Sequence, residues 1–498
     1  MLDFSFLNDQ PQFHLYTEPG RPQSGLYYKG QFDRSLGSIF NTLDEGGMVT
    51  NLRGNFAFFF YNEARLVGAV DHMPTVNLFY GMDDGRLLCS HIYTAIDREI
   101  TGGEFDYACQ AQARFFHGGS LGPGTFNTAI KRLESGTYFE VDRHSHRVSI
   151  KHYLDVYSHQ PDPSITMGDL SDILLEIIEE RTRDQFNILW SSGKDSNCVM
   201  GFIRKLGRLD RCHAITLYSA SNVSDERSNV EYLAERYGIQ PRFIDLGKYI
   251  GVTGSVLAKA SALPRESDYV ENLARTWNGF WWEPNNFQKY SSVVDSDLAG
   301  NPTFTGEAGD QIYGSWFSLV IPLYMIQNPS YTSQDISEIF LKFSAWLFRA
   351  PSVKHPKDWL DHLSSSSTRH DAWRNMIDWI VHQWDRIDTG GDITNKIEIL
   401  HYFSKASHRL YNYSQLIGVD FVHPFADYRI FQTIFRTPGI WKKSHRRTRG
   451  LSLDIIRDHV DDSPWNVWKW KSGIFMPAAQ SFNPSIQKEL LRVLGPRH

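Results

Sequence analysis

The chain has 498 residues, and its 57 acidic and 51 basic side chains give a formal charge of −6. At roughly 150 residues per domain, this length predicts two to four domains. The lack of net positive charge argues against a non-specific nucleic-acid binder. A content of 41% hydrophobic and 22% charged residues excludes a disordered chain. Four scattered cysteines, no signal-like N-terminus and no long apolar run favour a cytoplasmic protein that makes no membrane contact.

The first ~150 residues are typical of antiparallel β-structure. Strand-like patterns occupy 56–61, 65–70 and 86–90, and a hairpin is expected over 136–153. The dipeptide Asp84-Gly85 is a hairpin signal, because both residues tolerate the positive φ angles of a tight turn. A β-rich N-terminal domain is therefore expected.

The composition changes after residue 153. Segment 158–166 is rich in Pro and Ser and predicts a linker between domains 1–157 and 167–498. The expected elements that follow are a helix over 169–183, a strand over 186–190, a helix after 193, a strand over 213–217, a helix over 229–237 and a strand over 242–246. This alternation predicts an α/β fold with a parallel sheet, followed from about residue 315 by a helical extension.

The first chemical motif is segment 188–196, ILWSSGKDS, where a strand turns into a helix. Small residues let backbone amides approach an anion, and the helix N-terminus adds positive partial charge. The segment is no Walker A loop, because Lys194 precedes Asp195. It resembles the Ser-Gly-Gly-x-Asp-Ser loop of the ATP pyrophosphatases, with Ser192 in place of a glycine. The resemblance implies that ATP and pyrophosphate contact Ser191, Ser192, Gly193, Lys194, Asp195 and Ser196.

The second motif is segment 303–314, TFTGEAGDQIYG. It resembles the Ser-Gly-Glu-Gly-x-Asp-Glu segment of asparagine synthetases. The carboxyl ends of parallel strands meet at one edge of a sheet, so Asp195 and Asp310 are expected to share Mg²⁺ with the ATP phosphates. The resemblance also implies that Gly306 lies in the ATP site and Glu307 near the reacting acyl group. Alternatively, Asp310 only caps the next helix.

Two further segments follow the same family's order. Segment 418–427, GVDFVHPFAD, keeps a Pro-Phe-x-Asp core, although His423 replaces an apolar residue and Val422 an arginine. We expect it to have a structural role. Segment 465–475, WNVWKWKSGIF, resembles a stretch in which a lysine faces the acyl-adenylate. Lys471 is the best match and Lys469 its rival, while the alternative is a surface lysine packed on tryptophan.

Three weaker patterns remain. Tyr218 and Ser219 follow the second strand and are candidates for framing the nucleotide, as the resemblance implies. The basic run 442–449 is either an exposed loop or a contact to pyrophosphate or an acidic partner through Arg446, Arg447 and Arg449. The Gly-x-Ser-x-Gly pattern over 118–122 has no helix pattern after it, which disfavours a serine hydrolase.

These motifs together resemble the asparagine synthetase and β-lactam synthetase family. Segment 51–96 is similar to half of that family's glutaminase domain, an Ntn-hydrolase fold. In the family a cysteine directly after the initiator Met is the nucleophile, and here that residue is Leu2. The resemblance implies a degenerate glutaminase-like domain and a layout similar to that of lasso-peptide cyclases.

The resemblance implies an ATP- and Mg²⁺-dependent synthetase that adenylates a carboxylate and joins it to an amine without hydrolysing glutamine. One reading is an intramolecular or peptide cyclisation in natural-product biosynthesis, with a precursor peptide and biosynthetic partner proteins. Another is ammonia- or amine-dependent amidation of a small acid, favoured by Glu307, where β-lactam synthetases carry tyrosine. A third is a non-catalytic nucleotide-binding or scaffold protein.

Overall fold

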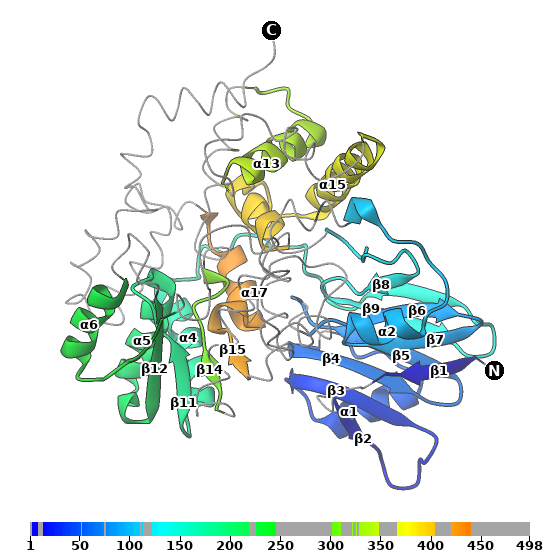
Figure 1. The fold of residues 1–498 in the computed structure, drawn as a ribbon, viewed down its shortest axis with the longest axis horizontal. Helices are drawn as coiled ribbons and strands as arrows, with labels where there is room; N and C mark the ends of the chain where they lie inside the picture. Colours follow the sequence, from blue (N-terminus) through cyan, green and yellow to red (C-terminus); the bar gives the residue numbers. More distant parts are fainter. Residues whose placement is uncertain are drawn as a thin grey trace, which may run out of the picture.

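The computed structural model describes residues 2–7, 13–50, 52–73, 76–109, 112, 121–218, 226–245, 301–309, 321, 325, 328–347, 366–403 and 420–439. Two β-sheets form the N-terminal part, and a third sheet with helices around it forms the C-terminal part (Figure 1). No helix in these ranges is both long enough and apolar enough to cross a bilayer.

The first sheet has four strands. Their spatial order is β1 (Asp3–Phe6), β7 (Arg86–Ser90), β6 (Phe79–Asp83) and β8 (Ile130–Arg132). Asp84 and Gly85, with φ of 46° and 75°, turn β6 into the antiparallel β7, as their hairpin signal predicts. The strand before this turn, β6, was not expected from the sequence. At the other side of β7, β1 pairs with it in parallel.

The second sheet has six antiparallel strands. Their order is β10 (Val148–His152), β9 (Thr137–Asp142), β5 (Arg65–Val70), β4 (Gly54–Tyr61), β3 (Gly25–Phe32) and β2 (His14–Tyr16). The two sheets enclose an apolar core that includes Phe59, Leu78 and Phe139. Leu2 is fully buried in this core, and its amide donates to the Arg143 carbonyl over 2.7 Å.

A short helix packs on each of the two N-terminal sheets. Helix α2 (Tyr93–Glu99) packs on the four-stranded sheet through Tyr93 and Ile96. Helix α1 (Leu36–Asp44) packs on the six-stranded sheet, where the Phe40 and Phe60 rings meet edge to face.

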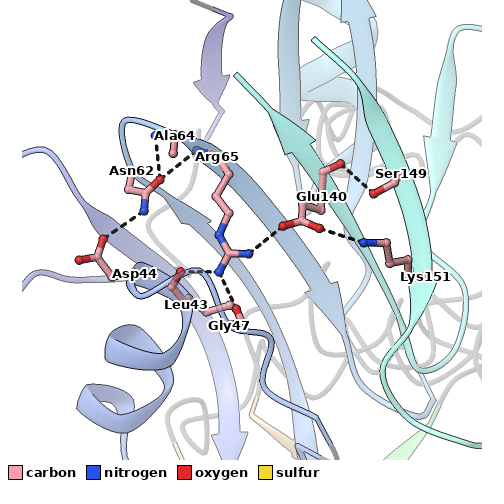
Figure 2. A network of polar contacts seen from close by, with 9 residues as sticks. All are labelled: Leu43, Asp44, Gly47, Asn62, Ala64, Arg65, Glu140, Ser149 and Lys151. Carbon is pink, nitrogen blue, oxygen red and sulfur yellow. Dashed lines mark hydrogen bonds and ion pairs between the residues drawn. The ribbon is translucent and has the colours of Figure 1, made fainter. Parts of the chain in front are cut away.

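The Arg65 guanidinium links the neighbouring strand β9 to the C-terminal end of α1 (Figure 2). It donates to Glu140 of β9 over 2.7 Å and to the carbonyls of Leu43 and Gly47 at the end of α1. A cation at a helix C-terminus satisfies carbonyls that have no partner within the helix. Lys151 of β10 reaches the other oxygen of Glu140 over 3.1 Å, so one charged network links α1 to the sheet edge.

The third sheet is entirely parallel. Its order is β13 (Arg242–Asp245), β12 (Cys212–Tyr218), β11 (Phe186–Leu189), β14 (Thr303–Phe304) and β15 (Phe421–Val422). Helices α4 (Met167–Arg181), α5 (Lys194–Lys205) and α6 (Glu226–Tyr237) alternate with the first strands. The predicted α/β class is therefore confirmed, with antiparallel pairing dominant in the N-terminal part and a parallel sheet in the C-terminal part.

The helical extension is also present. Helices α13 (Ser333–Leu347) and α15 (Ser366–Arg386) are joined by a 2.8 Å hydrogen bond from Ser333 to Asp385. Helix α17 (Tyr428–Arg436) follows a short 3₁₀ turn over Pro424–Ala426. The Asp427 side chain caps α17 by accepting from the Arg429 amide, which gives the Pro-Phe-x-Asp segment a structural role.

The two parts share one apolar core. The buried His72 ring, just after β5, lies 5.1 Å from the ring of Tyr428 and 5.2 Å from that of Phe431 on α17. Arg386 of α15 donates to His152 over 2.7 Å and stacks on Tyr157 at 3.9 Å. These contacts hold the helices of the C-terminal part against the second sheet.

The expected linker, segment 158–166, contains no helix or strand, but two of its residues bind residues far along the chain. Ser158 forms a parallel bridge with Asp388, and Asp162 pairs with Arg436 over 2.7 Å. Segment 158–166 is therefore held at Ser158 and Asp162 by residues of the C-terminal part, one just after α15 and one at the end of α17.

The His72 contact predicts acid sensitivity. Burial lowers the pKa of His72 to about 4, against 6.5 in the unfolded chain. Below pH 6.5 the unfolded chain binds a proton at His72 that the folded chain does not bind until the pH is about 4. With respect to this histidine, the free energy of unfolding is therefore highest above pH 6.5 and falls as the pH decreases towards 4. We expect a loss of about 1 kcal/mol at pH 5.5 and about 3 kcal/mol below pH 4.

Urea unfolding at pH 7.5 and 5.5 checks this expectation. His72→Leu should reduce the difference between the two pH values, whereas the same change at His144, which is exposed in the β9–β10 turn, should not. An unchanged difference in the His72 variant would contradict the assignment.

Candidate functional site

The candidate site lies at the carboxyl edge of the parallel sheet. Strands β11 and β14 are neighbours in register, with Asn187 opposite Thr303 and Ile188 opposite Phe304. The loops after these strands therefore leave the sheet side by side, which is the position where ligands bind in open α/β sheets. The first loop covers residues 190–196 and the second covers 305–309.

Hydrogen bonds inside the first loop define its shape. The Ser196 hydroxyl lies 2.9 Å from that of Ser191 and donates towards the carbonyls of Ser191 and Gly193. The amide of Gly193 donates to the Ser191 hydroxyl over 3.0 Å. Gly193 is the N-cap of α5 and has an extended backbone, so the loop enters the helix without a side-chain cap. Ser191 and Ser196 thus shape the loop in addition to any contact with a ligand.

Two buried residues to which the sequence analysis assigned no role brace this loop: Trp190 at its start and Asn197 directly after it. The Asn197 amide nitrogen donates to the carbonyls of Ser191 and Gly193, over 3.1 and 2.8 Å. Its oxygen accepts from the Trp190 indole over 2.8 Å, and that indole stacks on Tyr237 of α6. Asn197 is fully buried. The only sequence signal for this role is an amide side chain in the first turn of a helix, where backbone groups need partners.

The second loop presses against the first turn of α5. A Cβ added to Gly306 would lie 2.6 Å from the Ser196 nitrogen, and one added to Gly309 would lie 2.5 Å from the Asp195 carboxyl carbon. Real Cβ atoms do not come so close. Glycine at both positions therefore allows the backbone of the second loop to touch Asp195.

The acidic residues of the two loops are arranged as follows. Asp195 is half-buried in the first turn of α5, and Glu307 is half-buried in the second loop. Glu307 precedes Ala308, whose φ of 69° is rare for a residue with a side chain. Asp310, which follows Gly309 in the chain, lies outside the described residues. Within the described ranges, no three His, Cys, Asp or Glu side chains cluster as a metal site.

Tyr218 lies at the same sheet edge, at the end of β12. Its ring meets Phe243 of β13 edge to face, and the guanidinium of Arg227 lies 5.6 Å from its centre. Arg227 is held by Glu231 over 2.7 Å. An aromatic ring covered by a cation thus stands one strand away from the first loop.

Several candidate residues lie outside the described part of the chain. They are Ser219, Asp310, Arg446, Arg447, Arg449, Lys469 and Lys471. At one edge of the parallel sheet, the structure brings together the first loop, Gly306, Glu307 and the strand that ends in Tyr218. The functional roles of all the candidate residues stay predictions.

No protein-family profile matches the chain, and no curated protein does. Among solved structures, the chain is similar to a U34-tRNA thiolase from Methanococcus maripaludis, with 10% identity, a TM-score of 0.19 and coverage of 43% of this chain and 80% of that one. It is similar to a glutamine-dependent NAD⁺ synthetase from Acinetobacter baumannii, with 9% identity, a TM-score of 0.22 and coverage of 72% and 80%.

A third similar structure is the glutamine phosphoribosylpyrophosphate amidotransferase from B. subtilis, with 9% identity, a TM-score of 0.16 and coverage of 65% of this chain and 62% of that one. Similarities at this level identify neither a family nor an activity for the chain.

The close approach of the loops predicts a steric effect. Gly309→Ala would push a methyl group into the Asp195 carboxyl group, and such overpacking costs about 1–3 kcal/mol. We expect a lower urea midpoint, measured by tryptophan fluorescence. Gly102→Ala is the matched control, because a Cβ there would meet nothing within 4 Å. Equal midpoints for the two variants would show that the loops do not touch.

Proposed function

We propose that the protein is an ATP-dependent carboxylate–amine ligase that releases AMP and pyrophosphate. One observation carries this proposal: a small-residue loop opening a helix meets a second acidic loop at the carboxyl edge of a parallel sheet, with Gly309 against Asp195. The motif resemblances described above agree with this arrangement, and they assign adenylation chemistry to it.

The first loop would bind the β- and γ-phosphates of ATP and then pyrophosphate. Ser191, Ser192, Gly193 and Lys194 stand at the N-terminus of the 12-residue helix α5, where amides and the helix dipole favour an anion. Gly306, which lies against the first turn of α5, is proposed to border the nucleotide, as the resemblance implies. Tyr218 and Ser219 are proposed to border the adenosine, and Arg449 to contact pyrophosphate.

Asp195 and Asp310 would hold Mg²⁺. Carboxylate oxygens are the ligands that this ion prefers. Asp310 is bonded to Gly309, the residue that lies against the Asp195 carboxyl group, so a shared ion fits the donor set. When bound, Mg²⁺ would neutralise charge on the phosphates.

The reaction has two steps. A substrate carboxylate oxygen attacks the α-phosphorus of ATP, the bond to the β-phosphate oxygen breaks, and pyrophosphate leaves. An amine then attacks the acyl-adenylate carbonyl, loses its proton, and displaces AMP to form the amide. Glu307 would take up the amine proton, and Lys471 would stabilise the negative charge of the tetrahedral intermediate.

The amine donor is proposed to be the substrate itself. Leu2, which is buried between the two N-terminal sheets, has no side-chain nucleophile at the position where the resembled family carries its cysteine, and this supports an amine source other than glutamine. We therefore favour ring closure within a peptide or small molecule. Ammonia-dependent amidation of a small acid is the second candidate, because Glu307 matches the asparagine synthetase residue.

ATP–pyrophosphate exchange tests the proposal. Carboxylic acids and short peptides, each with and without ammonia, should reveal an acid that supports exchange. Asp195→Ala should reduce exchange about a hundredfold or more. Asp210→Ala is the matched control, because Asp210 is exposed at the amino end of β12, at the opposite edge of the sheet. Exchange at the parent rate in Asp195→Ala would refute the metal assignment, and no exchange with any acid would favour a non-catalytic protein.

Lys471 makes a separate prediction. Lys471→Ala should bind ATP as the parent does, by titration calorimetry, while amide formation falls about a hundredfold because the charge of the intermediate is no longer balanced. Lys469→Ala is the control two residues away. If only the Lys469 variant loses amide formation, the catalytic lysine is Lys469.

A further inference from the structure

A buried histidine is connected to the second acidic loop. The Nδ1 atom of His423 lies 2.7 Å from the Thr305 hydroxyl oxygen. The same oxygen accepts a hydrogen bond from the Glu307 amide over 3.2 Å. His423 comes directly after β15 and Thr305 directly after β14, and these strands pair in parallel. The two residues are 118 positions apart in the chain.

This connection is shielded from water. Thr305 is 2% exposed and His423 is 7% exposed. The His423 ring is stacked on Phe421 at an interplanar angle of 18°, which fixes its plane. A buried hydrogen bond cannot be replaced by water when one partner is removed, so the remaining group loses its interaction.

The turn that Thr305 holds is the one that presents Glu307. Its backbone is already constrained, because Ala308 has a positive φ and the Gly309 amide donates to the Gly306 carbonyl over 3.4 Å. On its other side, Gly309 touches Asp195. The Thr305 hydroxyl thus fixes the start of a loop whose far end is fixed by steric contact.

We infer that His423 is a positioning residue, which sets the direction of Glu307 through the Thr305 hydroxyl. The hydroxyl oxygen accepts from the Glu307 amide, and we assign its hydrogen to the bond with Nδ1. This assignment requires a neutral His423 with its proton on Nε2. The inference depends on the proposed function in one respect, which is that Glu307 acts at the reacting acyl group. The hydrogen-bonded connection itself rests on the distances above.

The kinetic test compares pairs of variants. Thr305→Val removes the hydroxyl with little change in shape, and we expect kcat for amide formation to fall about tenfold while KM for ATP stays within about twofold. Thr305→Ser should recover most of the loss. His423→Phe keeps the ring stacked on Phe421 but cannot accept the hydrogen bond, and should match Thr305→Val, whereas His423→Asn should recover part of the loss.

Thr303→Val is the matched control. Thr303 lies two residues earlier and is fully buried, and its hydroxyl oxygen accepts from the side-chain nitrogen of Asn187 over 3.1 Å. Its substitution by valine removes a comparable buried hydrogen bond, which joins β14 to β11 and does not involve Glu307. It should lower the unfolding midpoint and leave kcat within about twofold.

Two measurements need no substrate. Hydrogen exchange of the Glu307 amide should be at least about tenfold faster in Thr305→Val and His423→Phe than in the parent or in Thr305→Ser. The ¹⁵N shifts of His423 should show the proton on Nε2. If the parent releases no pyrophosphate, the proposed function fails while these two measurements still decide the connection.

Two results would overturn the inference. One is parental exchange of the Glu307 amide in both Thr305→Val and His423→Phe. The other is parental kcat in both variants of an enzyme that does form an amide. In the second case the hydrogen bond would brace the loop without serving the reaction.

Discussion

The site depends on one steric condition, which is that two loops from neighbouring parallel strands come into backbone contact. Gly306 and Gly309 have no Cβ, and only for that reason can the second loop lie against Ser196 and Asp195. Parallel pairing of β11 with β14 delivers the loops to the same edge, and the hydrogen bonds of Ser196 and Asn197 keep the first loop compact. The backbone amides at the start of α5 and the acidic residues Asp195 and Glu307 are thereby held within one small region.

The sequence predicts elements well where a local pattern determines them. The alternation over 186–245 appears as β11, α5, β12, α6 and β13, because the periodicity of apolar residues differs between strands and helices. The Asp84-Gly85 turn was found because its backbone needs positive φ. The strand β6 was missed, since its five residues include a glycine and show no clear alternation. The parallel pairing of β1 with β7 joins distant segments and leaves no local signal.

The candidate site was predictable to the extent that it follows from motifs and sheet topology. The motif segments indicate the loops, and the rule that ligands bind at carboxyl ends brings them together. The supporting residues were not predictable in the same way. Asn197, Thr305 and His423 act through hydrogen bonds to backbone or to each other, and the pairing of Thr305 with His423 depends on the order of strands in the sheet. Ser196 was expected as a ligand contact, and its bonds within the loop are visible only in three dimensions.

The shared core between the β-rich part and the helices also constrains how this chain can diverge. His72 packs against Tyr428 and Phe431, and Arg386 stacks on Tyr157. Side chains of each part therefore line the space that is filled by side chains of the other part. A larger or smaller residue on one side of this contact changes the volume available to the residue that packs against it. Replacements at 72 and 431 should therefore be tolerated mainly in compensating pairs during evolution. Selection for packing would then act on the N-terminal part as well as on the helices of the C-terminal part.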